Sequence, residues 1–515
     1  MRKTSSKMKN FTNIKFILLS LVIIGFFTQC NYQIKEFKEV SRKPNIFPDY
    51  DSVTIPVNIA PLNFIINEKS DKYYIVIKDK NSKQFVFTQK SNLVKFPIKK
   101  WKKYLFENIG DKISISVFCK QNKTWLKYQD LIINIAPDSI DKYLVYRLIN
   151  SVYLFWNDIG IYQRNIEEYK ESPVYLNTVA SLNCANCHAF CNYDPSKMIL
   201  HIRDNLAGTI IFNNDKLEKL NTKTKYTMSP GVYASWHPNG RLIAFAVVRL
   251  VPKQITKSGK IYDVGDKYSD IVVYDIEKNQ IFTSPLLSTS NRESLPAWSP
   301  DGNYLYFCLA PEAKKDDINS LLFVKYSLMG IAFDKEKNKF ADKVDTLLSS
   351  EKTKLSVSFP MPSPDGRYIL FAGTDYGYFT AFHTVSDLYL YDLVTRKLEK
   401  LPINSNACES YHSWSSNGRW IVFTSKRMDK VYSRLFISYF DENGKAHKPF
   451  VLPQKNPEWY NTFLKNYNKA EFVKNKVPLN AIDLRSVVYS EPKPVSFDTS
   501  VNIDALSGAT WIKNH

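Results

Sequence analysis

The chain has 515 residues, 44% of them hydrophobic and 23% charged, a composition that supports a large buried core and excludes a chain disordered throughout. Its length corresponds to roughly two to four domains. The 32 tyrosines and 32 phenylalanines favour pleated strands, so we expect an all-β protein. The net charge is +20, but the lysines are spread evenly, which is typical of a solvated surface and predicts no nucleic-acid partner.

The N-terminus has the pattern of an export signal. Five basic residues come first, namely Arg2, Lys3, Lys7, Lys9 and Lys15. The apolar run Phe16–Phe27 follows, and its 12 residues are too few to span a bilayer comfortably but suit the apolar region of a signal peptide. We therefore interpret residues 1–29 as a signal peptide.

The next residue is a candidate for lipid attachment. The segment Phe27-Thr28-Gln29-Cys30 resembles a bacterial lipobox, which implies that Cys30 carries the lipid and becomes the mature N-terminus. Gln29 departs from the pattern, because a small residue is usual there. The alternative is simple secretion with Cys30 removed or free. Residues 30–50 are expected to form a lipid-anchored tether, with the protein on a membrane of the cell envelope, periplasmic or outer-surface.

A small β-sandwich is predicted for residues 51–138. Short alternating runs such as Tyr73–Ile77 and Ile113–Val117 are separated by turns rich in Lys, Asn and Asp, which is the pattern of half-buried strands. No cluster of chemically reactive side chains appears in this region. We expect it to be a separate domain ahead of the part of the chain that carries the chemistry.

The segment Cys184-Ala185-Asn186-Cys187-His188 is a Cys-x-x-Cys-His motif, the attachment signature of c-type haem. Two thiols at this spacing can add to the two vinyl groups of one haem, and the adjacent histidine can reach the iron as the proximal ligand. Export to an oxidising compartment agrees with this interpretation. We therefore predict that Cys184, Cys187 and His188 bind haem c.

Two other roles stay open for these cysteines. Together with Cys191 and His188 they could ligate zinc, although Cys187 and His188 are too close in sequence for easy joint tetrahedral ligation. Cys184 or Cys187 could instead form a disulfide, with Cys119, Cys191, Cys308 or Cys408 as the partner. Cys191 needs an explanation of its own, because haem attachment uses only two thiols.

An internal repeat follows the motif. Its four copies are Ser235–Arg241, Ala297–Asn303, Met361–Arg367 and Ser413–Arg419. Each contains a tight turn of the Pro-Asp-Gly type, in which Pro presets φ, Asp bonds the local backbone and Gly accepts a positive φ. A phenylalanine lies nine residues after each Trp position, at Phe245, Phe307, Phe371 and Phe423. Flanking runs give each repeat about four strands, the content of one propeller blade.

This repeat resembles that of the TolB-like β-propellers, whose best-known members have six blades. The resemblance implies a propeller over residues 183–455, with the haem motif in the first blade. Two copies depart from the pattern, with Pro362 in place of Trp and Ser416 in place of Pro. Propellers of this kind commonly hold protein segments or glycans at their central channel.

The first and sixth blades have weaker signals. In the first, we place Cys191 at the Trp position, with Asn192–Pro195 as the turn and Met198–Ile202 as the next strand. The connecting segment 139–182 is a candidate for the sixth blade, through the runs Tyr143–Arg147 and Ile161–Arg164. Within the tail 456–515, strands near Arg485–Tyr489 are expected to close the ring.

This alignment predicts that the haem lies at one mouth of the propeller channel. It gives His188 the position held by Tyr233, Leu295, Phe359 and Tyr411 in the later blades, and propeller geometry brings such positions together around the axis. These large side chains would supply the apolar, partly closed setting that a haem needs. The alternative is a motif on the outer rim, facing the sandwich.

The sequence does not determine the second axial ligand of the haem iron. Histidine and methionine are the usual choices, and the candidates are Met198, His201, Met228, His237 and His412. We prefer His412, because it follows Tyr411 on the approach to the channel. The motif also resembles a group of exported propellers that carry it at the same place, together with a late segment like Tyr411–Trp420. The group is generally uncharacterised, so this supports the placement more than a function.

Two functions follow from these patterns. The first is a haem protein for electron transfer or haem-based sensing, and the second is a non-enzymatic scaffold that binds proteins or glycans, with structural cysteines. Without the signal peptide the charge is about +15, which could attract an acidic redox partner, acidic glycans or lipid headgroups. The chain has no hydrolase or dehydrogenase signature, so enzymatic activity stays uncertain.

Overall fold

The computed structural model describes residues 34–150, 158–254, 262–314, 317–380 and 383–506. The predicted signal peptide and Cys30 lie outside these ranges. Within them the chain is all-β with a few short helices, as the composition predicts. No helix in this part of the chain is long and apolar enough to cross a membrane.

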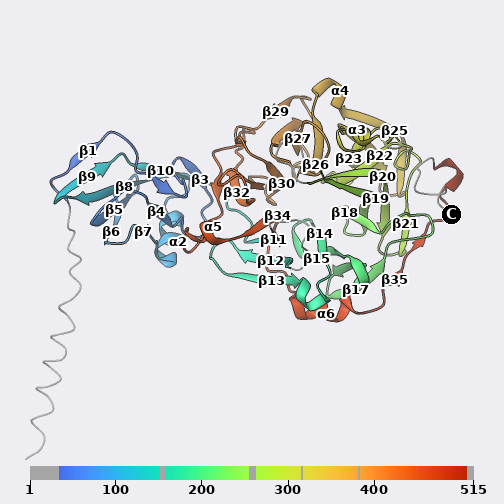
Figure 1. The fold of residues 1–515 in the computed structure, drawn as a ribbon, viewed down its shortest axis with the longest axis horizontal. Coiled ribbons are helices and arrows are strands. Elements are labelled where there is room, and N and C mark those ends of the chain that lie inside the picture. Colours follow the sequence, from blue (N-terminus) through green and yellow to red (C-terminus); the bar gives the residue numbers. More distant parts are fainter. Residues whose placement is uncertain (1–33, 151–157, 255–261, 315–316, 381–382, 507–515) are drawn as a thin grey trace, which may run out of the picture.

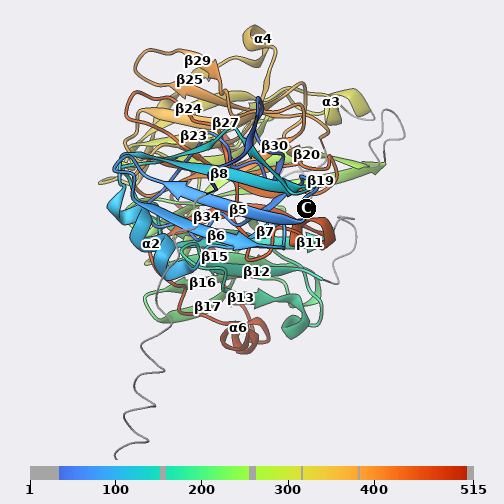
Figure 2. The same ribbon diagram turned by 90° about the vertical axis from the view of Figure 1, so that its left-hand side faces the viewer.

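The N-terminal unit contains two sheets and one helix (Figures 1 and 2). The larger sheet is built from β1 (Lys38–Val40), β3 (Val53–Ile55), β5 (Lys72–Lys78), β6 (Gln84–Gln89), β8 (Lys112–Gln121), β9 (Thr124–Tyr128) and β10 (Leu131–Ile135). The smaller sheet is built from β2 (Ile46–Phe47), β4 (Phe64–Ile66) and β7 (Leu93–Val94). Helix α2 (Ile98–Glu107), which the sequence analysis did not anticipate, buries Trp101 against Phe96 in a stack with ring centroids 5.0 Å apart.

The boundary expected at residue 50 was wrong. Strand β1 pairs with β9 and strand β2 pairs with β4, so the chain from Lys38 onward belongs to the folded unit and not to a tether. Arg42 holds this edge in place through an ion pair with Glu68 at 2.6 Å. Strand pairing and an ion pair with a distant residue are interactions that the local composition of residues 30–50 does not reveal.

The rest of the chain forms four-stranded antiparallel groups arranged in a ring (Figure 1). In chain order the first three groups contain β11 (Tyr143–Asn150), β12 (Gly160–Asn165) and β13 (Glu171–Leu176); β14 (Ala185–Cys191), β15 (Asp194–Ile202), β16 (Gly208–Asn213) and β17 (Lys216–Asn221); and β18 (Gly231–Trp236), β19 (Leu242–Gln254), β20 (Tyr262–Asp275) and β21 (Gln280–Phe282).

The remaining groups contain β22 (Arg292–Trp298), β23 (Tyr304–Ala310), β24 (Ser327–Asp334) and β25 (Lys339–Leu348); β26 (Ser356–Pro362), β27 (Tyr368–Thr374), β28 (Asp387–Asp392) and β29 (Leu398–Lys400); and β30 (Glu409–Trp414), β31 (Trp420–Ser425), β32 (Arg434–Tyr439) and β33 (Phe450–Val451). Short helices α3 (Ile318–Leu322), α4 (Ser350–Thr353) and α5 (Trp459–Thr462) lie in the connections. This blade-like repetition is the architecture of a β-propeller.

The ring is closed by a strand other than the one expected. Strand β34 (Lys465–Val473) pairs antiparallel with β11, so a late segment completes the group formed by the connecting segment 139–182. The expected closure near Arg485–Tyr489 was wrong, because residues 481–488 form helix α6 (Ala481–Val488). A reciprocal capping box between Asn480 and Asp483 starts this helix. Strands β35 (Lys493–Pro494) and β36 (Ser496–Phe497) extend the outer edges of two blades.

The repeated turns adopt the conformation that their sequence predicts. Gly240, Gly302, Gly366 and Gly418 have φ values of 71°, 73°, 72° and 68°. This left-handed region is open to glycine without a steric penalty. The turn chemistry of the repeat is therefore confirmed at all four copies.

A buried glutamate recurs at the start of two inner strands with different partners. Each accepts from the backbone N–H and the hydroxyl of the residue four positions earlier, Thr289 for Glu293 and Ser405 for Glu409, but only Glu409 also accepts from an arginine, Arg427 at 3.1 Å. Burial raises the pKa of Glu293 to about 7. In an unfolded chain that pKa is about 4.3, so folding stability falls as the pH rises from about 4 to about 7.

This difference gives opposite expectations for two matched variants. Glu293→Gln removes the charge, so its free energy of unfolding should rise relative to that of wild type by up to about 3 kcal/mol between pH 4 and pH 8. The basis is that one unit of pKa shift corresponds to about 1.4 kcal/mol. Glu409→Gln should lose stability at pH 8, because buried Arg427 keeps its charge without a counter-charge. Denaturant unfolding at pH 4, 6 and 8 measures both. If the free energy of unfolding changed with pH in the same way for Glu293→Gln and for wild type, the raised pKa of Glu293 would be contradicted.

Candidate functional site

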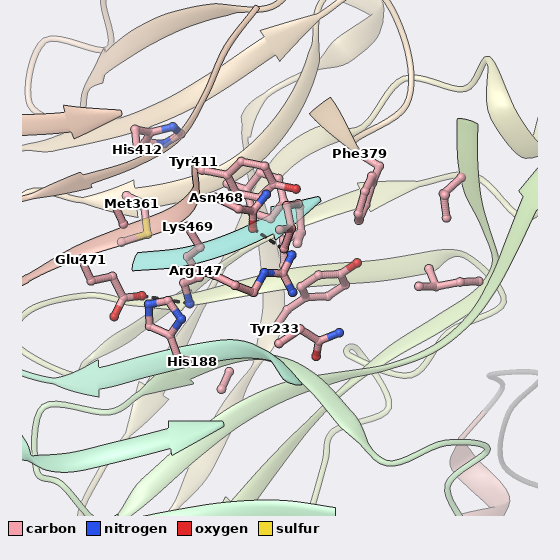
Figure 3. Close-up of a pocket in the computed structure, with 18 of the residues that line it drawn as sticks. Arg147, His188, Tyr233, Met361, Phe379, Tyr411, His412, Asn468, Lys469 and Glu471 are labelled. Carbon is pink, nitrogen blue, oxygen red and sulfur yellow. Dashed lines mark hydrogen bonds and ion pairs between the residues drawn. The ribbon is translucent and has the colours of Figure 1, made fainter. Parts of the chain in front are cut away.

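The inner strands of the ring surround one cavity of about 440 Å³, which is within the range of small-molecule sites (Figure 3). Strands β14, β18, β22, β26, β30 and β34 all contribute lining residues, and β11 adds Arg147 and Ile149. The cavity therefore lies on the axis of the ring.

Each of five inner strands contains a β-bulge of two consecutive residues; in four of them both bulge residues line this cavity, and in β14 His188 does. The bulge pairs are Cys187–His188, Tyr233–Ala234, Leu295–Pro296, Phe359–Pro360 and Tyr411–His412. The first residue has a positive φ at Tyr233, Leu295, Phe359 and Tyr411, with values between 45° and 54°. Bulges re-aim side chains in this way and recur near functional sites.

The bulges correct the sequence alignment of the first blade by one residue. Cys187, and not His188, holds the position of Tyr233, and Phe190, rather than Cys191, holds the Trp position. The hairpin after β14 is the cause, because Cys191 pairs with Asp194 across a two-residue turn that is shorter than the turn of the later blades. His188 therefore shares its position with His412.

His188 is fully buried and lines the cavity. Neither ring nitrogen has a hydrogen-bond partner among the described residues. Burial, helped by the positive charges of Lys469 and Arg147, holds the pKa of His188 well below its usual value, so the ring is neutral. A neutral imidazole with a free nitrogen is the form that binds a metal ion.

The two cysteines of the motif lie on the same stretch of chain. Cys184 is buried in a small cluster with Ile149 and Ile159, both of which line the cavity. Cys187 takes the first bulge position, which in the four later blades carries a cavity-lining side chain. His188 thus lines the cavity itself, and Cys184 packs against two of the residues that line it.

Cys191 has a structural environment of its own. It packs in a different core cluster with Ala189 and Trp236, and its thiol donates to the carbonyl of His237 at 3.7 Å. The thiols of Cys119, Cys191 and Cys308 are buried and not in disulfides. Among the side chains that the structure describes, no group of three His, Cys, Asp or Glu residues could hold a metal ion on its own. These observations give no support to the zinc and disulfide alternatives that involve Cys191.

Of the second-ligand candidates, the structure brings only His412 to the cavity. Its Nε2 lies 3.1 Å from the carbonyl of Leu370, its Nδ1 has no partner among the described residues, and burial lowers its pKa to about 4. Both ring nitrogens of His237 are engaged, by Gly302 at 2.9 Å and by Asn239 at 3.1 Å. His201 bonds Thr209 at 2.8 Å and packs on Phe245. Met198 is in the core, and Met228 is not among the lining residues.

Sequence reasoning missed Met361, which also lines the cavity. In the view of Figure 3, His412 lies above Met361 and His188 lies below it. Met361 directly precedes Pro362, the residue that replaces Trp in its blade. That substitution was the available signal, because it marks a blade whose inner strand departs from the repeat.

One wall of the cavity is aromatic. Tyr233, Phe359 and Tyr411 come from three different blades, with ring centroids 6.3 Å apart for Tyr233 and Phe359 and 5.0 Å for Phe359 and Tyr411. The hydroxyl of Tyr233 lies 3.5 Å from that of Tyr378, which in turn donates to buried Asp266. Burial raises the pKa of Asp266 to about 6. A polar chain therefore leads from the aromatic wall into the protein.

Comparison with known proteins identifies no family for this chain. No protein family and no curated protein matches the sequence. Solved structures with some likeness include a chain of a nidogen–laminin complex, with 7% identity, 65% of this chain and 99% of that chain covered, and a TM-score of 0.36. Another is the Swd1 β-propeller domain of Myceliophteria thermophila, with 11% identity, 52% and 71% covered, and a TM-score of 0.32.

A third is a 6-phosphogluconolactonase-like protein of Bacteroides uniformis, with 12% identity, 60% and 97% covered, and a TM-score of 0.32. At these TM-scores the likeness carries no argument about function. The propeller assignment rests on the strand pairing and on the ring of inner strands around the cavity. The class of protein is therefore a β-propeller with a Cys-x-x-Cys-His motif at its axis.

Proposed function

We propose that this protein is a TolB-like propeller of six blades that carries one covalent c-type haem in its axial cavity. The observation that supports this most directly is His188, a fully buried imidazole on the cavity wall whose two nitrogens lack partners among the described residues. Burying an unsatisfied polar group costs about 1–3 kcal/mol. A bound iron would relieve that cost.

The residues present fit the group. Cys184 and Cys187 would hold the haem through thioether bonds, and His188 would ligate its iron on one side. His412 and Met361 are the candidates for the other side. When bound, the haem supplies one-electron transfer or the binding of a small ligand.

The chain itself contributes the setting. The aromatic wall of Tyr233, Phe359 and Tyr411 would supply an apolar surface beside the haem, and such surroundings tune the potential of a bound haem. The covering strands leave His188 fully buried, which keeps it neutral. The redox partner is proposed to be a component of the cell envelope.

Haem staining tests the proposal. Protein made in a host with the c-type maturation machinery should keep a haem-staining band after denaturation, and Cys187→Ala should weaken or abolish that band. The matched control is Cys191→Ala, whose thiol lies in a different core cluster, and it should keep the band. A wild-type protein that never stains would overturn the proposal.

Lipid anchoring at Cys30 is the second part of the proposal. It rests on the apolar run Phe16–Phe27 directly before Cys30, a pattern typical of lipoprotein signals. Wild-type cells grown with labelled fatty acid should yield a labelled protein in the membrane fraction. Cys30→Ala should lose the label, and labelling that persists unchanged in this variant would exclude the site.

A second candidate function is a scaffold that binds a protein segment or a glycan in the same cavity. The aromatic wall favours it, because aromatic side chains commonly line such pockets. In that case the cysteines are structural. Haem-free protein would then be the functional form, and Cys187→Ala would leave binding of the partner intact.

A further inference from the structure

The cavity has a second wall that is polar and basic. Arg147, Arg203 and Lys469 line it together with the amides of Asn186 and Asn468. These residues come from β11, β14, β34 and the position directly after β15. Figure 3 shows Arg147, Asn468 and Lys469 near one another in the cavity. The aromatic side chains of Tyr233, Phe359 and Tyr411 belong to the same lining, so the cavity is amphipathic.

Only one of the three cations has an acidic partner. Lys469 pairs with Glu471 at 2.9 Å, and Glu471 also accepts from the backbone N–H of Phe190 at 3.2 Å. In the described part of the chain, neither Arg147 nor Arg203 forms an ion pair with a carboxylate. The basic wall therefore carries two uncompensated charges.

The two arginines are held by neutral groups alone. Arg147 donates to the side-chain oxygen of Asn468 at 3.0 Å and to the carbonyl of Ala185 at 3.4 Å, while its buried Nε has no partner among the described residues. With the amide of Asn186 turned by 180°, its oxygen accepts from Arg203 at 2.8 and 3.1 Å. Guanidinium groups fixed in this way are preorganised for an anion.

We propose that Arg147 and Arg203 form a carboxylate-binding site on the basic wall of the axial cavity. A planar guanidinium can bind a carboxylate through two parallel hydrogen bonds, and the aromatic side chains of the same cavity suit a flat apolar body. Two sources share this chemistry. One is the pair of carboxylates of the haem, which rests on the proposed function, and the other is a free dicarboxylate, which does not.

The haem-free chain provides the first arm of the test. Thermal unfolding is measured in sodium succinate and in sodium chloride at equal ionic strength, because a ligand that binds only the folded state raises the melting temperature. Wild type should melt higher in succinate. Arg147→Gln/Arg203→Gln should lose that shift, and Arg147→Lys/Arg203→Lys should keep part of it, because the charges remain.

A matched control removes a cation elsewhere. Arg241 pairs with Asp275 away from the cavity lining, so Arg241→Gln should keep the full succinate shift. The melting temperature of each variant in chloride shows whether it folds. If Arg147→Gln/Arg203→Gln does not fold, the succinate shift of Arg147→Lys/Arg203→Lys is compared with that of wild type instead.

The haem-loaded protein provides the second arm. If the haem carboxylates occupy the site, Arg147→Gln/Arg203→Gln should lower the equilibrium constant for reduction about ten-fold, or about 59 mV for one electron. Its potential should also become dependent on pH between about 4 and 6, where released carboxyl groups titrate. A pH-independent potential is expected in wild type over that range.

The outcomes separate the sources. A succinate shift in haem-free but not in haem-loaded protein assigns the site to the haem carboxylates, and a shift in both assigns it to a free carboxylate. The proposal is overturned if haem-free wild type shows no succinate shift and the loaded double variant keeps the wild-type potential. If the chain never carries haem, the proposed haem function is wrong. The melting temperatures of the haem-free protein in succinate and in chloride then test the carboxylate-binding site by themselves.

Discussion

Replacing His188 by leucine is expected to stabilise the haem-free protein and to damage the haem-loaded one. In the haem-free chain the substitution removes two buried nitrogens that lack partners among the described residues and fills the space with an apolar group. The expected gain in the free energy of unfolding is about 1–3 kcal/mol. In the loaded protein the same change would remove the proposed protein ligand of the iron, so the visible absorption bands of the haem should shift.

Opposite signs in the two forms distinguish a ligand from a packing residue. The control is His237→Leu, because both nitrogens of His237 are hydrogen-bonded and their partners would be left unsatisfied. That variant should destabilise both forms and leave the haem bands unchanged. A His188→Leu protein that is less stable without haem, and spectrally normal with it, would remove His188 from the site.

Replacing Trp414 by alanine is expected to cost about 3–5 kcal/mol of unfolding free energy, the range for large-to-small changes at buried aromatic positions. Trp414 is 1% exposed. It packs against Phe440 with ring centroids 5.0 Å apart, and its indole N–H donates to the carbonyl of Met361 in the preceding blade at 3.0 Å. The side chain thus joins two blades as well as filling the core.

Denaturant unfolding measures this cost, with Trp125→Ala as the matched control. Trp125 lies half-buried on the N-terminal sheet against Tyr74, with ring centroids 6.3 Å apart, and its loss should cost far less. A loss below about 1 kcal/mol at Trp414 would mean that the blades do not depend on this contact.

The repeat made the propeller predictable, because its turns carry their own chemistry. Gly240 and its counterparts must adopt a positive φ, and four copies of such a turn reveal the blades without any tertiary information. The closing strand β34 has no such signal. It belongs to its blade only through pairing with β11, which lies more than three hundred residues earlier in the chain.

The site was predictable in its residues but not in its register. The motif pointed to His188, and the structure places it on the cavity with Tyr233, Phe359 and Tyr411. The alignment was wrong by one residue because it assumed a long turn after β14, where the chain makes a two-residue turn at Asn192 and Tyr193. That error hid the equivalence of His188 and His412.

The basic wall of the cavity could not be predicted. Arg147, Arg203 and Lys469 are far apart in sequence, and each looks like one of many cations in a chain with 70 lysines and arginines. Only the arrangement of the inner strands brings them together. The cavity therefore depends on long-range pairing that local patterns do not encode.

The visible absorption spectrum of the purified protein tests the central claim most directly. Wild-type protein from a host with the c-type maturation machinery, denatured and reduced in alkaline pyridine, should give the bands of one covalent haem per chain. The spectrum should disappear in a Cys184→Ser/Cys187→Ser variant that folds normally. Wild-type protein that is colourless under these conditions would contradict the assignment of haem to the axial cavity.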